Sequence, residues 1–479
     1  MGTMAEMLST PLGVIEWFVY LLAAVMFVIG LHLMNSPKTA RKGNMVSAVG
    51  MILAVVMAFI VLFAGEISNG FQHGVAVVLL IAGIIIGAVA GVVSAKKVKM
   101  TDMPQLVSVF NTVGGGAAAL VALNDILTSE GTPSIVVLIT AGLGIMIGSV
   151  TFSGSLIAAG KLQGIKWVKK LNLPGKGFWN ILFAVLTVVS FVMLCVQPGQ
   201  RLLWSVLTTV FALCYGLVFV IPIGGADMPV VISVLNACTG TAVAMSGLAI
   251  NNIALIVAGA LVGAAGVTLS IAMSKAMNRP LLSVLAGGFG GANAAAGAGE
   301  GPEGSMKETS ADDLAVQLVY AEKVIFVPGF GLAQAQAQRE LADLGVLLKN
   351  HGVEVSYAIH PVAGRMPGHM NVLLAEANVP YEELVDDITP QSPQANVALV
   401  VGANDVTTPA ARKPGTPVSG MPILDVDKAQ NVVVMKRGRG TGYAGIQNEL
   451  YFEDNTQMLF GDAKASLQAV IAAVKELIN

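Results

Sequence analysis

The sequence predicts an α-helical bundle that spans a membrane, followed by a soluble α/β domain with a parallel sheet. Of the 479 residues, 55% are hydrophobic and only 12% are charged, whereas roughly a quarter of the residues in a soluble domain carry charge. Before residue 285 the apolar residues form runs of about 20, the length that crosses a bilayer. From residue 314 onward, short β-branched runs alternate with helical stretches, which is typical of a doubly wound parallel sheet.

The apolar runs number nine, and we expect each of them to be a transmembrane helix. They lie at 14–34, 44–64, 75–95, 104–127, 134–160, 178–197, 202–222, 229–250 and 252–274. Lys and Arg residues cluster after the first, third, fifth and ninth runs, whereas the loops after the even-numbered runs hold only Arg201. Because cytoplasmic loops are rich in Lys and Arg, we expect the N-terminus outside the cell and the C-terminal domain in the cytoplasm.

Composition argues against some classes of function. With 27 Lys and Arg against 29 Asp and Glu, there is no reason to predict a nucleic-acid partner, which would need a clustered basic face. Three cysteines lie inside apolar segments without metal-site spacing, so we predict no metal site. Close helix packing is indicated by glycines four residues apart, namely Gly83, Gly87 and Gly91, Gly144 and Gly148, and Gly259 and Gly263.

An internal repeat lies within the predicted bundle. The run Asp102-Met-Pro-Gln-Leu-Val-Ser-Val-Phe-Asn111 recurs 125 residues later as Asp227-Met-Pro-Val-Val-Ile-Ser-Val-Leu-Asn236. At 1.5 Å per residue, each Asn lies roughly 13 Å from its Asp, near the middle of the bilayer. These amides either join helices or line a polar path. We take Asn111, Asn236 and Asp227 as candidates for a proton path and its coupling, although Asn cannot itself carry the proton.

The segment 286–313 is rich in Gly, Ala, Ser and Glu, a composition that predicts a flexible linker. It separates a transmembrane domain at 1–285 from an α/β domain at 314–479. In the latter we expect strands at 324–327, 353–359, 397–402 and 431–435.

A glycine turn follows the first of these strands. Gly329-Phe330-Gly331 resembles the start of a Rossmann-type dinucleotide fingerprint, in which the N–H groups of a helix start face phosphate. The third position of the fingerprint falls on Gln334. An ordinary strand-to-helix corner is therefore the alternative interpretation.

Other strand ends favour a phosphorylated dinucleotide. Where an NAD site places an acid after its second strand, this chain has His360. The run Lys436-Arg437-Gly-Arg439 would suit the 2′-phosphate of NADP, or it is a solvated basic turn. Arg365 lies on a turn that either contacts phosphate or is simply exposed. Asp405 either contacts ligand or caps a helix.

Several long passages are similar to one family. HPVAGRMPGHMNVLLAEA (360–377), VGANDVTTPAA (401–411), MKRGRGTGYAGIQN (435–448), MLFGDAKAS (458–466) and ADMPVVISVLN (226–236) closely resemble the β subunit of proton-translocating NAD(P) transhydrogenases, and the resemblance covers nearly the whole chain. It implies a Rossmann-like domain that binds NADP(H), and a partner α subunit that binds NAD(H). It also implies hydride transfer coupled to proton movement, of the Si-specific/Re-specific type, active only with that partner.

The resemblance also implies the residues of the cofactor site. Lys436 and Arg437 would hold the 2′-phosphate of NADP. A lid would be formed by Gly438, Arg439, Gly440, Thr441, Gly442 and Tyr443. The remainder of the site would be lined by Gly329, Phe330, Gly331, Val362, Ala363, Gly364, Arg365, Met366, Pro367, Gly402, Ala403, Asn404, Asp405, Val406, Gly420, Met421, Asp462 and Ala463.

One departure from the family concerns the proton carrier. Some members have His at the position of Asn111, and others supply a His from a separate small membrane α chain. The resemblance therefore implies that small chain as a partner. It further implies a dimer of the assembled heteromer and a location in a bacterial inner membrane. The rival hypothesis is an ion channel or transporter gated by a regulatory dinucleotide-binding domain.

Overall fold

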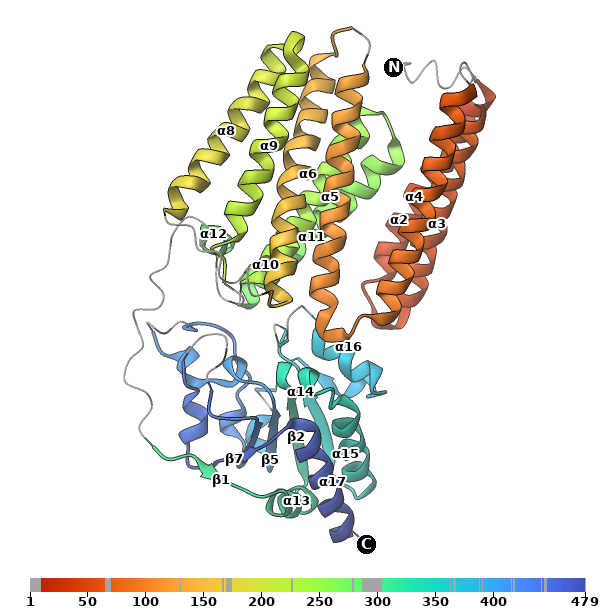
Figure 1. Ribbon diagram of the computed structural model, residues 1–479. Coiled ribbons are helices and arrows are strands. Elements are labelled where there is room, and N and C mark those ends of the chain that lie inside the picture. The colour runs from red at the N-terminus through yellow and green to blue at the C-terminus, as the bar shows by residue number, and fades with distance from the viewer. Residues whose placement is uncertain are drawn as a thin grey trace. The chain divides into compact units, whose positions relative to one another are not determined.

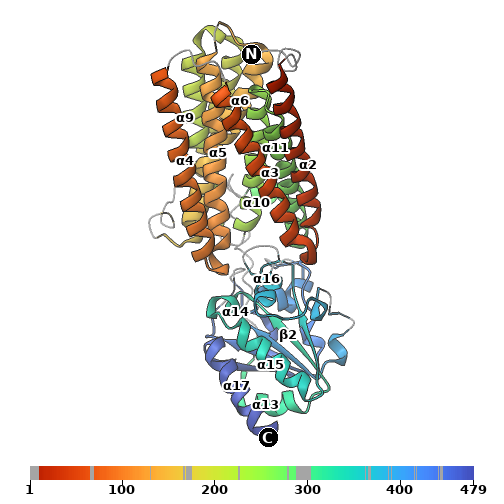
Figure 2. The same ribbon diagram turned by 90° about the vertical axis from the view of Figure 1, so that its right-hand side faces the viewer.

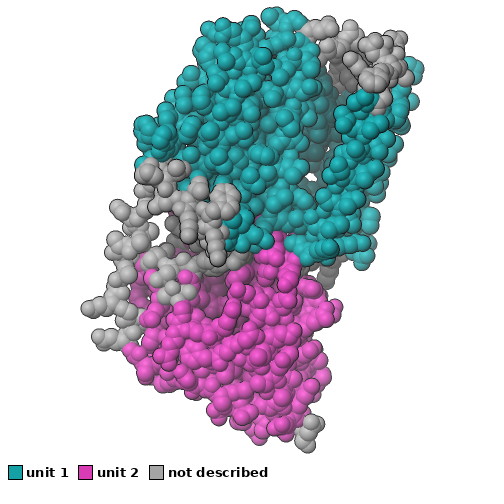
Figure 3. Space-filling model, in the orientation of Figure 1, with its two compact units in different colours: residues 1–98, 105–223, 231–269 teal, residues 99–104, 224–230, 270–479 magenta. Residues whose placement is uncertain are grey.

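The computed structural model describes residues 10–64, 70–129, 131–165, 168, 175–224, 227–277, 280–286, 304–361, 363–364, 368–386, 388–389, 391–414, 416, 418–440, 442 and 446–478. The chain forms two compact units (Figure 3). One contains residues 1–98, 105–223 and 231–269, and the other contains residues 99–104, 224–230 and 270–479.

The described residues include nine helices that are long and apolar enough to cross a membrane, which confirms the nine predicted spans. Figures 1 and 2 show them as α2 (Pro11–Leu33), α3 (Pro37–Ala64), α4 (Gly70–Lys97), α5 (Met103–Thr128), α6 (Ile135–Leu162), α8 (Lys176–Val196), α9 (Arg201–Val220), α10 (Met228–Ala249) and α11 (Ile253–Ala276). Shorter helices are η1 (Met100–Asp102), η2 (Pro198–Gln200) and α12 (Leu281–Ala286). Local sequence explains some starts: Thr10 and Ser134 accept hydrogen bonds from the first-turn amides of α2 and α6.

Glycines bring several of these helices into backbone contact. A Cβ atom added to Gly115 of α5 would lie 2.9 Å from the carbonyl oxygen of Gly148 on α6, and one added to Gly259 of α11 would lie 2.6 Å from that of Gly240 on α10. Two of the three predicted glycine faces therefore do pack closely. The third differs, because Gly83, Gly87 and Gly91 of α4 have no described atom within 4 Å of such a Cβ.

The second unit is built on a seven-stranded sheet. Its strands are β1 (Lys307–Glu308), β2 (Lys323–Pro328), β3 (Glu354–Ala358), β4 (Leu384–Val385), β5 (Val397–Val401), β6 (Asn431–Lys436) and β7 (Thr456–Phe460). All pair in parallel, in the order β1-β7-β6-β5-β2-β3-β4. Without β1, this is the strand order of the doubly wound dinucleotide-binding fold, and it confirms the predicted parallel sheet.

The sheet buries both faces, as parallel sheets do. Val324 and Phe326 of β2 pack in a core with α13 (Ala311–Val319), α15 (Gln338–Asn350), α16 (His369–Glu376) and α17 (Ala463–Ile478). Ile325 and Val327 pack in a second core. The second core is closed by residues in or beside short 3-10 turns, among which are η5 (Ser392–Gln394), η8 (Val426–Lys428) and η9 (Glu449–Phe452).

The four expected strands correspond to β2, β3, β5 and β6, whereas β1, β4 and β7 were not expected. β1 and the first residues of α13 fall within the range 286–313, where the sequence suggested a linker. Residues 287–303 of that range lie outside the described residues.

Candidate functional site

Most of the predicted cofactor residues that the structure describes lie where the strands of the sheet end. β2 pairs with β3 along one edge and with β5 along its other edge, so the chain extends the sheet first in one direction and then in the opposite one. This reversal between β2 and β5 is the point at which doubly wound sheets bind ligands. Gly329 and Gly331 follow β2, Ala363 and Gly364 follow β3, Gly402 to Val406 follow β5, Lys436 to Gly440 end and follow β6, and Asp462 and Ala463 follow β7.

The glycine turn after β2 packs directly on the turn after β5. The amides of Gly329 and Gly331 donate to the carbonyls of Val401 and Gly402, both at 2.9 Å. A Cβ added to Gly329 would lie 2.4 Å from the α-carbon of Ala403. The sequence suggested that these amides face phosphate, but they are used within the protein. These glycines instead allow two turns to meet at the switch point.

The helix after this turn is short. This helix, α14 (Phe330–Ala335), has six residues and is followed by the cap residue Gln336, which adopts a left-handed conformation with φ 53°. The ring of Phe330 lies 6.4 Å from that of His369 on α16. A Cβ added to Gly364, which has φ 109°, would lie 2.4 Å from Nδ1 of His369. The ends of β2 and β3 are thereby connected through one buried histidine.

Asn404, after β5, is held by two side chains that the sequence did not single out. The hydroxyl of Tyr451 donates to Oδ1 of Asn404 at 2.8 Å, and Nδ2 of Asn448 donates to its carbonyl at 2.9 Å. Asn448 also accepts from the amide of Leu450 and so begins η9. An Asn two residues before an apolar run is a capping signal in the sequence, but its contact with Asn404 depends on the fold.

Lys436 ends β6 and is half-buried. Its ammonium group donates to the carbonyl of Gly440 and lies 4.6 Å from the ring centre of Tyr451. Burial lowers the pKa of Lys436, and the charge of Asp405 partly opposes this effect. A Cβ added to Gly442 would lie 2.2 Å from Oδ1 of Asp405. The cation, the carboxylate and the predicted lid therefore meet at the ends of β5 and β6.

The other two cations of this segment point elsewhere. Arg437 donates to Oε1 of Gln334 on α14 at 2.8 Å, so it connects the end of β6 with the glycine turn. Arg439 pairs with Glu308 of β1 at 3.2 Å and lies 5.7 Å from the ring centre of Phe460. The three cations that are nearly consecutive in sequence therefore have three different partners.

His360, after β3, is buried, and its Nε2 lies 2.7 Å from the carbonyl oxygen of Pro422. Burial lowers the pKa of His360, although this hydrogen bond acts in the opposite direction. The contact brings the predicted residues Gly420 and Met421 beside the end of β3. Gly420 has φ 74° and donates to the carbonyl of Ala411 at 2.7 Å.

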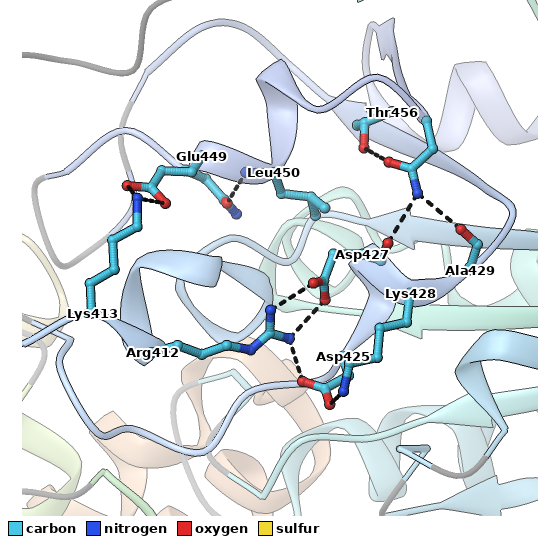
Figure 4. A network of polar contacts seen from close by, with 11 residues as sticks. Arg412, Lys413, Asp425, Asp427, Lys428, Ala429, Glu449, Leu450 and Thr456 are labelled. Carbon is cyan, nitrogen blue, oxygen red and sulfur yellow. Dashed lines mark hydrogen bonds and ion pairs between the residues drawn. The ribbon is translucent and has the colours of Figure 1, made fainter.

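A polar network holds the segment between β5 and β6 (Figure 4). Arg412 donates to Asp427 at 2.6 and 2.9 Å and to Asp425 at 2.5 Å, and Lys428 also donates to Asp425. Hydrogen bonding to Asp427 raises the pKa of Arg412. Burial raises the pKa of Asp425, but the bonds from Lys428 and Arg412 outweigh it and the pKa is lowered. These ion pairs fix the segment that carries Gly420 and Met421.

Some predicted residues have another local role or lie outside the described residues. Oδ1 of Asp462 accepts from the amides of Lys464 and Ala465 at the start of α17, which is a capping role. Outside the described residues lie Val362, Arg365, Met366, Pro367, Thr441 and Tyr443.

The membrane repeat forms equivalent contacts in its two copies. Ser108 of α5 donates to the carbonyl of Ser155 on α6, and Ser233 of α10 donates to that of Gly266 on α11. The asparagines differ. Asn111 is 5% exposed and its Nδ2 lies 3.5 Å from the carbonyl oxygen of Ile232, whereas Asn236 is only partly buried. Asp227, one residue before α10, is also partly buried.

Comparison with known proteins agrees with both parts of this structure. Residues 16–473 match the family described as NAD(P) transhydrogenase beta subunit. Two sequences named NAD(P) transhydrogenase subunit beta, both from Rhodospirillum rubrum, are each 46% identical to this chain over 467 residues, which is 95% of this chain and 98% of the relative. Since this match runs through the nine helices and the doubly wound sheet alike, the chain belongs to the NAD(P) transhydrogenase beta-subunit family.

Proposed function

We propose that this chain is the NADP(H)-binding membrane subunit of a transhydrogenase that couples hydride transfer between NAD(H) and NADP(H) to proton translocation. The observation that carries the proposal is the arrangement at the ends of β3 and β6. The β3 end carries buried His360 in place of a ribose-binding acid, and the β6 end carries half-buried Lys436. This distribution favours a dinucleotide with an additional phosphate.

The residues present fit such a cofactor. Lys436 and Arg437 would hold the 2′-phosphate, because cations form charge-assisted hydrogen bonds with phosphate oxygens. The glycine turn, packed on the turn after β5, would position both turns at the switch point where the cofactor binds. When bound, NADP(H) accepts or supplies a hydride at its nicotinamide ring. The chain's own part is to bind and orient the cofactor and to cover it with residues 438–443.

A partner is required for the reaction. One dinucleotide site cannot exchange hydride between two nucleotides, so NAD(H) must be bound elsewhere. The relatives are named as beta subunits, which supports an α subunit that carries NAD(H). We further propose a small membrane α chain that supplies the titrating proton carrier, and a dimer of the assembled heteromer.

The proposed location is a bacterial inner membrane. The distribution of Lys and Arg among the loops supports an N-terminus outside and an α/β domain in the cytoplasm. Asn111, Asn236 and Asp227 would belong to the proton route through the bundle, with the asparagines positioning water and Asp227 at its cytoplasmic start.

The rival hypothesis, a nucleotide-gated channel, involves no hydride transfer. The purified chain is combined with its NAD-binding partner, NADPH and an oxidised NAD analogue, and reduction of the analogue is followed. We expect reduction with the partner present and none with either protein alone. A channel would bind nucleotide and pass ions but would leave the analogue oxidised, and that result would reject the proposed function.

A further inference from the structure

Hydrogen bonds connect α5 and α10 at regular intervals. Nδ2 of Asn111 lies 3.5 Å from the carbonyl oxygen of Ile232, and Oγ1 of Thr239 lies 3.5 Å from that of Asn111. Oγ of Ser246 donates to the carbonyl of Ala118 at 2.9 Å. The partners recur every seven residues on both helices, which is about two turns, so they lie along one seam. The seam is narrow, since a Cβ on Gly114 would lie 3.0 Å from Cγ2 of Thr239.

Asp125 occupies the next position of this seven-residue series on α5. Its side chain is partly buried, and its Oδ2 atom is buried without a hydrogen-bond partner among the described residues. The neighbouring Ala122 and Ile126 pack with Leu138, Leu194 and Ala249 in an apolar cluster. Beside such a cluster the buried Oδ2 atom loses its hydration, and no described group replaces it.

A second feature of Asp125 is its position on the helix. Asp125 lies in the last turn of α5, where no basic residue is present. The C-terminal end of a helix carries partial negative charge, which repels a nearby carboxylate. Asp125 thus has a buried oxygen without a described partner and lies at a helix end of like charge. An acid in such a position inside a membrane-spanning helix is a candidate for function.

Few other charged groups are described at this end of the bundle. Arg201, at the start of α9, donates to the carbonyl of Gly131 at 2.7 Å. Glu16 lies in the second turn of α2, a helix outside the seam. Asp125 is therefore the described acid that continues the series from Asn111.

We propose that Asp125 exchanges the transported proton with water at the end of the bundle opposite to Asp102 and Asp227. This inference rests on the proposed proton translocation and names the group at the outer end of the proton route. Asp125 lies roughly 21 Å along α5 from Asn111. The carboxylate takes a proton from the seam to become a neutral acid, and then releases one proton to water and regains its charge. The hydroxyls of Ser246 and Thr239 donate hydrogen bonds along the seam, but they do not store the proton.

The experiment uses the full chain assembled with its partner chains in vesicles of one orientation. Asp125→Asn preserves the shape of the side chain and removes its titration, whereas Asp125→Glu keeps a carboxyl group. Glu16→Gln is the matched control, an acid at the same end on a helix outside the seam. Hydride transfer and proton movement are recorded on the same vesicles. NADPH affinity and the thermal midpoint report whether each variant is folded.

We expect Asp125→Asn to slow coupled proton movement by about 100-fold, the lower range for loss of a positioned proton-transfer group. NADPH affinity and the thermal midpoint should not change. The rate should also lose its dependence on the pH of the compartment that faces residue 125. Asp125→Glu and Glu16→Gln should pump and retain that dependence. A purely structural role of Asp125 would not alter the response to pH on one side.

Normal pumping by folded Asp125→Asn, with its one-sided pH response intact, would overturn the assignment and leave the proposed function standing. Hydride transfer without proton movement in the unsubstituted assembly would instead reject the proposed function itself. If Asp125→Asn lowers the thermal midpoint, the assay is repeated with Asp125→Ser. The pumping rate of that variant and its response to pH on one side then decide whether the assignment stands.

Discussion

The amide of Gly331 donates a 2.9 Å hydrogen bond to the carbonyl oxygen of Gly402, and neither residue has room for a side chain. A Cβ atom on Gly402 would lie 2.4 Å from the α-carbon of Gly331, and one on Gly331 would lie 2.7 Å from the α-carbon of Gly402. The turns after β2 and β5 are therefore joined backbone to backbone at the switch point.

Gly402→Ala should destabilise the α/β domain. Gly402 has φ 68°, a conformation that costs an L-residue roughly 1–2 kcal/mol, and the added methyl group also overlaps the turn after β2. We expect a lower thermal midpoint and weaker NADPH binding. Gly438→Ala is the control for the thermal midpoint, since a Cβ there would have no atom within 4 Å. Equal midpoints for the two variants would contradict the packing described.

Lys436→Ala should raise the NADPH dissociation constant by about ten-fold or more, because a hydrogen bond to a charged group contributes ~1.5–3 kcal/mol and ~1.4 kcal/mol corresponds to one decade. The weak NADH affinity should change little. Lys323→Ala is the control. Lys323 begins β2, at the end of the strand away from the glycine turn, and pairs with Glu354 there. Equal binding of NADH and NADPH by the unsubstituted chain would rule out the assignment.

His360 should make folding stability depend on pH. Burial lowers its pKa below the usual 6.5, so the unfolded chain binds a proton more readily than the folded chain. The stabilisation is complete above about pH 6.5 and is lost as the pH falls from there toward the folded pKa. His360→Gln should flatten the fall in thermal midpoint as the pH is lowered below about 6.5. Exposed His351, replaced in the same way, should have no effect, and an unchanged pH response in His360→Gln would argue against this origin.

Tyr443→Ala should speed the release of NADP(H). Tyr443 lies among the glycines of the predicted lid, which permit movement while the ring closes on the cofactor. Its neighbour Gly442 lies against Asp405, which supports a lid at the end of β5. Stopped-flow release of NADPH measures the effect, and the thermal midpoint should stay the same. An unchanged release rate would indicate an ordinary surface tyrosine.

Asn236→Leu should stop coupled proton pumping while NADPH still binds. If Asn236 merely joined helices, its loss would cost about 0.6 kcal/mol and turnover would persist. Asn236 suits this test better than Asn111, which is more deeply buried and contacts α10 directly. Pumping is measured in vesicles that contain the partner chains. Thr268→Val is the control, because its hydroxyl donates within its own helix, and normal pumping by Asn236→Leu would return this residue to a structural role.

Local patterns predicted much of this molecule. Runs of about 20 apolar residues are long enough to span a bilayer whatever surrounds them, and all nine became helices. The strand β2 and the glycine turn after it were also predictable, since β-branched residues and glycine have strong local preferences. The predicted close packing of Gly83, Gly87 and Gly91 was not found among the described residues, because spacing on one helix does not specify a neighbour.

The sequence by itself therefore determined the class of the protein: membrane helices, a parallel doubly wound sheet, and glycines where two turns approach. These features depend on neighbours in the chain or on composition. The tertiary structure decided the partners of the site residues. Only folding brings Tyr451 and Asn448 to Asn404, separates Lys436, Arg437 and Arg439, and occupies the amide of Gly331. All of those contacts except that of Lys436 with Gly440 join residues far apart in sequence, and a hydrogen bond depends on distance and angle in space, which spacing along the chain does not specify.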